Sequence, residues 1–249
     1  MVQNCIIRPE PIILPMTQLS GKVIAIAGGT GGLGPTVVKA FADAGAFVAL
    51  GDRNADKQQQ LAGELQLRID QYSRHTVDLL DATQAGEWAS ALMDQHGRVE
   101  GMLHLVGGWR GGTAIAQFPA QDWQLLNDLL IQTTWNVIRA FIEPLKISKG
   151  RFIMVSSPQA QRPAHTNAAY AAGKAASEAL TLAMANEFAG SGATANIISV
   201  NAIQTPAMPS NNNAGTFTRA EDIASAMLFL CSDAASAMNG QRINLFGAA

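Results

Sequence analysis

A glycine-rich stretch near the start of the chain limits most strongly what this chain can fold into. It runs from Ala27 to Gly34, after the apolar run 23–26 and before a helix-like segment. A strand, a glycine turn and a helix in this order present backbone N–H groups, at the positive end of a helix dipole, to a phosphate. The alternative is an ordinary tight turn, because a glycine-rich turn alone is a weak signal. The flanking strand and helix favour a dinucleotide site.

The rest of the chain alternates between short apolar runs and helix-like segments. The pattern predicts strands at 23–26, 47–51, up to 77–78, 102–106, 151–155, 193–200 and 242–245, and helices at 35–44, 55–70, 85–95, 122–145, 168–189 and 216–230. Strands and helices that alternate at this spacing form right-handed βαβ units. We therefore predict one doubly wound (Rossmann) α/β domain over residues 20–249, with a parallel sheet of about seven strands flanked by helices.

The first residues do not resemble a targeting segment. Pro9, Pro11 and Pro15 interrupt the apolar residues at positions 6–7 and 12–14, which leaves them shorter than the core of a signal peptide. No later apolar run is long and uninterrupted enough to span a bilayer. We expect residues 1–19 to form an N-terminal extension, with Met16 as an alternative start of the protein.

Composition limits the class of partner. The chain has 249 residues, of which 48% are hydrophobic, so it can bury a large core. A net charge of −2 gives no basic patch, which argues against nucleic acid and anionic membranes as partners. The two cysteines make no disulfide framework, and none of the four histidines has a partner at metal-ligand spacing. We expect a cytoplasmic protein that acts on a small molecule and holds no metal.

Two neighbouring residues at the end of the second expected strand favour different nucleotides. Asp52 lies where an acidic side chain can bind the adenosine ribose hydroxyls, and this favours NAD. Arg53 is the type of residue that neutralises a 2′-phosphate, and this favours NADP. We give Asp52 more weight, because a carboxylate repels a 2′-phosphate.

The fourth expected strand runs into a loop with four glycines around Trp109 and Arg110. Such a loop brings the backbone close to a ligand, with Trp109 as an aromatic wall of a pocket. The alternative is a flexible connection in which Trp109 folds back onto the core. His104, inside the apolar strand, is more consistent with a satisfied core histidine than with a metal ligand.

Tyr170 and Lys174 lie four residues apart in the helix expected over 168–189. This spacing puts both side chains on one helix face, so the ammonium can lie near the phenol and favour its ionised form. The two side chains form a candidate acid/base pair. The pair alone is not specific, because Tyr and Lys often lie four apart on solvated helix faces.

With Ser157 and Asn239-Gly240-Gln241 added, the motifs resemble the short-chain dehydrogenase/reductase family over residues 19–247. The resemblance implies that Ser157, Tyr170 and Lys174 are catalytic, and that Trp109 and Ser157 contact the substrate. It also implies a cofactor site made of Gly28, Thr30, Gly31, Gly32, Leu33, Gly34, Asp52, Arg53, Asp78, Leu79, Val106, Gly107, Gly108, Tyr170, Lys174, Ile203 and Thr205. In the family, Asp78 would contact the adenine, and Ile203 and Thr205 would hold the nicotinamide amide.

The chain departs from the family pattern at three places, one of which is Val200-Asn201 in place of the Pro-Gly that follows the sixth strand. His104–Gly107 replaces the family's Asn-Asn-Ala-Gly segment, and Leu130 stands where the family has a fourth catalytic residue, an Asn that helps to hold a water near the lysine. Leucine cannot bind that water. The glycine loop around Trp109, together with Trp135, looks like dihydropteridine reductase, a family member that also lacks this Asn.

The resemblance implies an NAD(P)-dependent oxidoreductase that transfers a hydride between nicotinamide and a carbonyl/alcohol substrate, with NAD expected and NADP as the alternative. Tyr170 would donate the proton, Lys174 would lower the pKa of Tyr170 and bind the nicotinamide ribose, and Ser157 would bind the developing alkoxide. One alternative is a dihydropteridine-reductase-like reduction of a quinonoid pterin or another C=N substrate. The other is a dinucleotide-binding sensor without catalysis. The family's helix faces suggest a homodimer or homotetramer, and the polar loop 206–215 is expected to be a short cover over the site.

Overall fold

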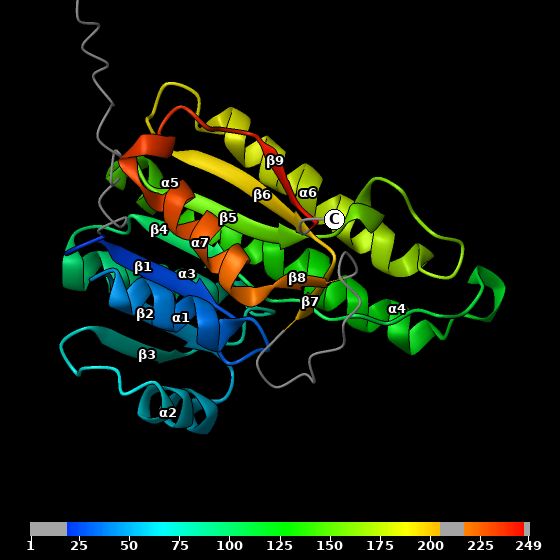
Figure 1. Cartoon of the computed structure of the whole chain (residues 1–249), viewed down its shortest axis with the longest axis horizontal. Helices are drawn as coiled ribbons and strands as arrows, with labels where there is room; N and C mark the ends of the chain where they lie inside the picture. The colour runs from blue at the N-terminus through cyan, green and yellow to red at the C-terminus, as the bar shows by residue number, and fades with distance from the viewer. Residues whose placement is uncertain (1–18, 205–216, 247–249) are drawn as a thin grey trace, which may run out of the picture.

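The computed structural model describes residues 19–204 and 217–246, and Figure 1 shows their arrangement. One parallel sheet has the order β3-β2-β1-β4-β5-β6-β9. Its strands are β1 Val23–Ala27, β2 Phe47–Asp52, β3 Tyr72–Thr76, β4 Gly101–His104, β5 Arg151–Ser156, β6 Thr194–Val200 and β9 Arg242–Leu245. The predicted doubly wound fold is confirmed. The strand order reverses between β1 and β4, and in such sheets ligands bind beside the carboxyl ends of the strands at that point.

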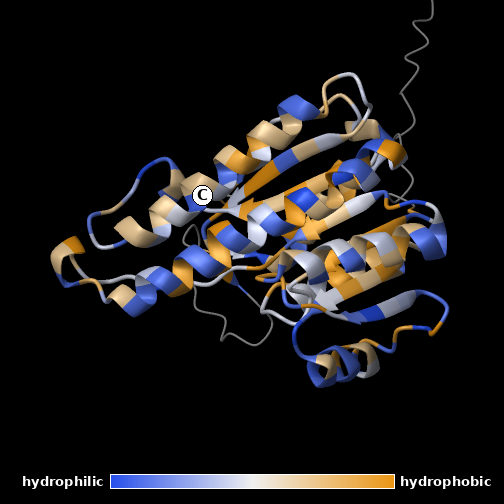
Figure 2. Cartoon of the chain, turned by 180° about the vertical axis from the view of Figure 1, so that it is seen from behind, coloured by the Kyte–Doolittle hydropathy of each residue, from blue (hydrophilic) through white to orange (hydrophobic). Residues whose placement is uncertain are grey.

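Helices cover both faces of the sheet (Figure 1). α1 Gly34–Asp43, α2 Ala55–Glu64 and α7 Ala220–Cys231 share one apolar core with the sheet, and α3 Ala82–His96, α5 Thr133–Ser148 and α6 Ala168–Glu187 share the other. All five residues of β1 are buried, because side chains on both of its faces meet a helix layer. Figure 2 shows the hydrophobic residues gathered along the strands.

The predicted helix over 122–145 is interrupted. The structure has α4 Ala120–Leu126, then a π-helical segment, η2 Asn127–Gln132, and then α5. Because a π-turn takes in one more residue than an α-turn, η2 shifts which side chains face the sheet. The remaining elements are three short 3₁₀ turns and a two-stranded sheet: η1 Ile115–Gln117, η3 Pro158–Ala160, η4 Asp233–Ala235, β7 Ala202–Gln204 and β8 Phe217–Arg219.

Other predicted boundaries are also wrong: α3 begins at Ala82 rather than at residue 85, and α7 begins at Ala220 rather than at residue 216, because Phe217–Arg219 form β8. α2 ends at Glu64 rather than near residue 70, because Gln66 has a φ of 52° and turns the chain back, so that Leu67 packs against the core. β4 ends at His104 rather than at Val106; the Leu105 N–H still donates to the Ala27 carbonyl of β1 at 2.9 Å, and the chain leaves the sheet after this bond. In the part of the chain that the structure describes, no helix is long and apolar enough to cross a membrane.

Candidate functional site

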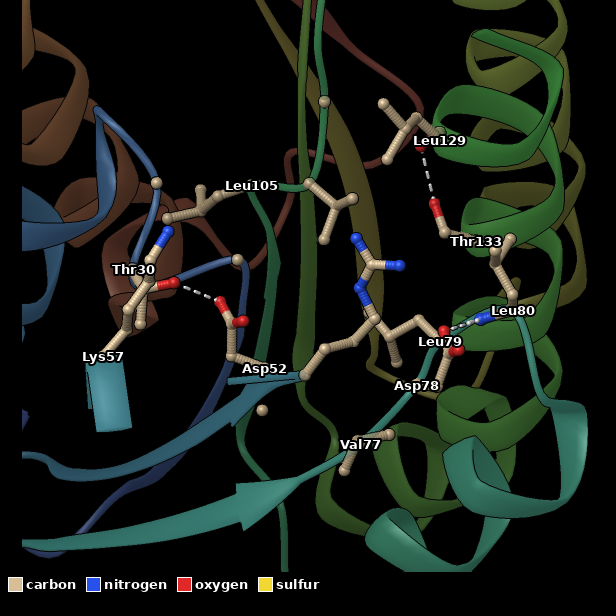
Figure 3. A pocket seen from close by; sticks show the side chains of 16 residues that line it. Thr30, Asp52, Lys57, Val77, Asp78, Leu79, Leu80, Leu105, Leu129 and Thr133 are labelled. Carbon is tan, nitrogen blue, oxygen red and sulfur yellow. Dashed lines mark hydrogen bonds between the residues drawn. The ribbon is translucent and has the colours of Figure 1, made fainter. Parts of the chain in front are cut away.

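Two cavities meet at the carboxyl edge of the sheet, where the strand order reverses. One, of about 400 Å³, lies between the glycine turn and the ends of β2 and β3 (Figure 3). The other, of about 750 Å³, lies between the same turn, the loop after β4 and the start of α6. Both are lined by Gly28, Gly31, Leu105, Val106 and Gly107. The two cavities therefore form one groove across the switch point.

The glycine turn fits a phosphate-binding role. Gly28 has a φ of 80°, and a Cβ there would lie 2.9 Å from the backbone nitrogen of Val106. α1 begins without a side-chain cap after Leu33, and Leu33 lines the larger cavity together with Gly31 and Gly32, so the N-terminus of this helix lies at the groove. Gly34 lines neither cavity; a Cβ there would overlap the carbonyl of Gly29, so its role is to close the turn.

Near the glycine turn, the smaller cavity combines the Asp52 carboxylate with two cations (Figure 3). The Thr30 hydroxyl donates to Asp52 Oδ2 at 2.5 Å, which ties the turn to the end of β2. Arg53 and Lys57 line the same cavity. Lys57 was not predicted, although its place in the first turn of α2, four residues after Arg53, was a signal for it. The cavity thus offers Asp52 to ribose hydroxyls and two cations to a phosphate.

The far end of this cavity has mainly apolar walls that can enclose a flat ring. Asp78 and Leu79 lie there as predicted; Asp78 Oδ1 accepts the N–H of Leu80 at 3.0 Å, as Figure 3 shows. Leu129 and Thr133 complete the wall, and the Thr133 hydroxyl donates to the Leu129 carbonyl at 2.7 Å. These two were not predicted, because helical periodicity does not show the π-helical segment that turns them toward the cavity.

The larger cavity brings together the residues expected to do the chemistry. Those named from the sequence that line it are Gly28, Gly31, Gly32, Leu33, Val106, Gly107, Gly108, Trp109, Ser157, Tyr170, Lys174 and Ile203. Thr205 and the loop 206–215 lie outside the described residues. Gln159 and Asn167 also line the cavity and were not predicted. Among the described residues, no group of three His, Cys, Asp or Glu side chains is placed to hold a metal ion.

The environment of Tyr170 corrects one prediction. Burial raises the pKa of the Tyr170 phenol, and a hydrogen bond with Ser157 only partly opposes this effect. The sequence analysis expected the pKa to be lowered by Lys174. Because burial dominates, the phenol is protonated at neutral pH and is suited to donate a proton.

Lys174 is buried, and its ammonium donates to the Val155 carbonyl at 2.8 Å. Burial lowers the pKa of Lys174 to about 8, because a charged group loses hydration there, and the carboxylate of Glu178 opposes this lowering. The ammonium therefore stays charged at neutral pH, with hydrogens left for a ligand in the groove.

Leu130, at the position of the family's Asn, lies in η2 and is 1% exposed. Its carbonyl accepts two hydroxyls, those of Thr134 and Ser177, each at 2.6 Å. The π-turn interrupts the regular helix hydrogen bonds, and these hydroxyls satisfy the carbonyl. Both acceptor positions of this oxygen are thereby occupied.

His104 is buried, as predicted, but it is not fully satisfied. Its Nε2 lies 3.0 Å from the Thr134 hydroxyl, while its Nδ1 has no partner among the described residues. Burial, and secondarily the charge of Lys174, lowers the pKa of His104 to about 3, so the ring is neutral. Since the Thr134 hydrogen goes to the Leu130 carbonyl, Nε2 carries the hydrogen of the imidazole.

Trp109 does not fold back onto the core. Its side chain is 56% exposed and forms part of the wall of the larger cavity, beside Ser157 and Tyr170. The loop that carries it is tied to the segment before α6, because the Gly112 N–H donates to the Thr166 carbonyl at 2.9 Å. The structure therefore has an aromatic surface at the mouth of the cavity.

The known proteins to which the chain is similar are reductases and dehydrogenases. The family model described as enoyl-(acyl carrier protein) reductase matches residues 27–245. The chain is 27% identical over 244 residues to the 3-oxoacyl-(acyl-carrier-protein) reductase FabG of Thermotoga maritima, covering 92% of this chain and 98% of that one. It is also 27% identical over 243 residues to the 7alpha-hydroxysteroid dehydrogenase of Escherichia coli, covering 92% and 94%.

Solved structures agree with the fold. A short-chain type dehydrogenase/reductase from Mycobacterium ulcerans superposes with a TM-score of 0.82 at 26% identity, covering 92% of this chain and 89% of that one. The reversal of strand order, the glycine turn and the Ser157, Tyr170 and Lys174 side chains thus occur in a chain whose relatives are oxidoreductases.

Proposed function

Because the chain belongs to the short-chain dehydrogenase/reductase family, we propose that it reduces the carbonyl group of a flat or bulky small molecule with NADH. One observation carries the proposal: Ser157, Tyr170 and Lys174 together line the cavity that continues into the glycine turn. Membership of a family of oxidoreductases favours this enzyme over a sensor without catalysis.

Each side chain has a task that follows from its environment. A bound nicotinamide dinucleotide supplies the hydride. Tyr170, protonated because burial raises its pKa, donates the proton to the carbonyl oxygen. Ser157 stabilises the charge that develops on this oxygen. Lys174, held by the Val155 carbonyl, offers its remaining hydrogens to the nicotinamide ribose.

The residues of the groove fit such a cofactor. The turn at Gly28 leaves no room for a Cβ, the residues just before the uncapped start of α1 line the groove, and mainly apolar residues line its far end. We propose NADH as the nucleotide, since the Asp52 carboxylate would accept ribose hydroxyls and repel a 2′-phosphate. The neighbouring Arg53 and Lys57 are the groups that would hold NADPH instead.

Substituting Asp52 and its neighbours tests the choice of nucleotide. Asp52→Ala should strengthen NADPH binding and weaken NADH binding in a fluorescence titration. Arg53→Ala and Lys57→Ala should weaken only NADPH binding. An unaltered protein that binds NADPH more tightly than NADH would show that the two cations outweigh the carboxylate.

Removing the Tyr170 hydroxyl tests the enzyme reading. Tyr170→Phe should lower kcat by about 10²–10⁴, the usual contribution of a positioned acid, and leave the NADH dissociation constant unchanged. Tyr72→Phe is the matched control, because Tyr72 is the other of the chain's two tyrosines and lies on β3. Near-full activity of Tyr170→Phe would mean that the proton comes from another group.

A quinonoid pterin or another C=N substrate is the second candidate, and the exposed Trp109 at the mouth of the cavity favours it, because an indole can stack on a flat ring. Ser157→Ala separates the two. Loss of a hydrogen bond to a developing alkoxide should lower kcat for a carbonyl substrate about 10²–10³-fold. The same change should have little effect on a C=N substrate that needs only Tyr170. A screen of ketones, quinones and pterins with NADH supplies the substrates for this comparison.

A further inference from the structure

An ion pair between the buried Glu178 and the partly exposed Arg242 lies near the catalytic residues and has no task in the reaction described above. Glu178 stands one helical turn beyond Lys174 on α6, and its side chain is 2% exposed. Its Oε1 accepts the Ser156 hydroxyl and its Oε2 accepts Nε of Arg242, each at 2.6 Å. Arg242 begins β9, the strand at the edge of the sheet. The pair therefore joins α6 to β5 and β9.

The bond to Ser156 fixes the end of β5. Ser156 lies between Val155, whose carbonyl accepts the Lys174 ammonium at 2.8 Å, and Ser157, which lines the larger cavity with Tyr170. A shift of this short segment would displace both groups at once. Glu178 thus supports the lysine in two ways, through the backbone of β5 and through its own charge.

The charge of Glu178 matters because few other charges face Lys174 in the described part of the chain. His104, on β4, is neutral because burial lowers its pKa to about 3. Tyr170, on α6, is neutral because burial raises its pKa. Glu178, on α6, is the carboxylate that favours the charged lysine, and Arg242, on β9, lies beyond it.

Burying the Glu178 carboxylate costs free energy, which suggests that the residue has a role beyond stability. Placing a carboxylate in the interior carries a desolvation penalty of several kcal/mol, and an apolar pair of similar volume is often at least as stable. Here both carboxylate oxygens are bound, one to a hydroxyl and one to a guanidinium that is 39% exposed. A partly exposed cation neutralises Glu178 incompletely, because water screens it.

We propose that Glu178 and Arg242 are positioning residues that together set the protonation of Lys174: Glu178 favours the ammonium, and Arg242 limits how strongly it does so. The proposal rests on the role of Lys174 in the proposed function. It predicts that neutralising the two members of the pair has opposite effects on the lysine. A purely structural pair would predict effects in the same direction.

The experiment compares Glu178→Gln with Arg242→Gln. Glutamine at 178 keeps an acceptor for Ser156 but removes the charge, so Lys174 should lose its proton at a lower pH, with about tenfold weaker proton affinity. Glutamine at 242 leaves Glu178 without its counter-charge, so Lys174 should lose its proton at a higher pH. Arg242→Lys keeps the cation and should titrate like the unaltered protein.

The titration is measured directly by NMR of protein labelled with ¹³C at the lysine side chains, with Lys174→Met to assign the signal. Shifts of opposite sign in the two Gln variants, and none in Arg242→Lys, are expected. Shifts of the same sign, or none, would overturn the proposal. If Glu178→Gln does not fold, the comparison of Arg242→Gln with Arg242→Lys still tests the proposal. Only Arg242→Gln is expected to change the pH at which Lys174 loses its proton.

The pH dependence of NADH oxidation separates this proposal from the proposed function. If the two Gln variants shift the NMR titration of Lys174 in opposite directions and shift the pH dependence of the rate in the same way, both the ion-pair proposal and the proposed function are supported. Opposite NMR shifts with unchanged rate profiles would support the role of the ion pair and contradict the role of Lys174 in the reaction. If the variants at 178 and 242 show no NMR shifts while Tyr170→Phe is inactive, the ion-pair proposal is contradicted and the proposed function is not.

Discussion

The depth at which Tyr170 and Lys174 are buried decides the protonation states at the site. Both groups lie on one face of α6, as their spacing predicts, but the spacing carries no information about hydration. Burial raises the pKa of Tyr170 and lowers that of Lys174 to about 8. At neutral pH the site therefore holds a neutral phenol and a charged ammonium, an arrangement suited to reduction rather than to oxidation.

The pKa of Lys174 leads to a prediction of how NADH binding depends on pH. The ammonium is present below a pH of about 8 and is lost as the pH rises through the pKa of Lys174. NADH affinity should thus be constant below this pH and fall above it, because a neutral amine binds the ribose oxygens less strongly. Fluorescence titrations across this range measure the effect, and Lys174→Met should remove it. A pH dependence that persists in Lys174→Met would assign it to another group.

At the scale of elements, the regular alternation of strands and helices can be predicted from the sequence, and the irregular segment within a helix cannot. The sequence predicts a strand at or close to each of the seven strands of the main sheet, and their alternation with helices predicts a doubly wound parallel sheet, but not the order of its strands. η2 has no such signal, because one π-turn in a long apolar helix changes the period over only a few residues. Leu129 and Thr133 were missed as lining residues for that reason. Lys57 was missed although its place four residues after Arg53 was a signal, because lysines on solvated helix faces are common and the signal is not specific.

Gly173 on α6 makes the packing of η2 testable. A Cβ on Gly173 would lie 2.8 Å from Cδ1 of Leu130, which is buried and has little room to move. Gly173→Ala should destabilise the protein by about 1–3 kcal/mol through overpacking. Gly86→Ala is the matched control, because a Cβ there meets nothing within 4 Å; it should stabilise by about 0.4–1 kcal/mol. Urea unfolding measures both.

The double variant Gly173→Ala/Leu130→Ala tests whether the loss of stability in Gly173→Ala comes from its contact with Leu130. Leu130→Ala alone should cost about 2–5 kcal/mol by leaving a cavity. If overpacking is the cause, the two changes together should cost less than the sum of the single changes, because alanine at 130 gives the new methyl group room. Additive costs would mean that Gly173 and Leu130 do not act through their contact.

At the scale of the whole molecule, one part of the structure extends beyond the two layers that cover the sheet. α4, the loop before it and the start of α6 project from the body of the fold (Figures 1 and 2). Large apolar side chains are exposed there: Ile115 is 72% exposed and Trp123 is 49% exposed. They border an apolar cavity of about 480 Å³, which Ala168 and Ala169 of α6 complete. Composition alone gives no sign of this, because the exposed side chains come from separate segments.

We expect this apolar surface, defined by Ile115, Trp123 and the cavity beside them, to be covered by a second copy of the chain. Contiguous exposed apolar patches mark interaction sites, and large aromatic residues dominate the binding energy of such interfaces. Trp123→Glu should therefore weaken self-association by at least about 2 kcal/mol, about thirtyfold in Kd. Ile69→Glu is the matched control, because Ile69 is 88% exposed but borders Tyr72 and Arg74, residues that line a different part of the molecule. Sedimentation velocity over a range of concentrations should give a dimer or tetramer for the unaltered protein and for Ile69→Glu, and dissociation to a smaller species at about thirtyfold higher concentration for Trp123→Glu. A monomeric unaltered protein, or equal dissociation of both variants, would show that the surface does not hold copies of the chain together.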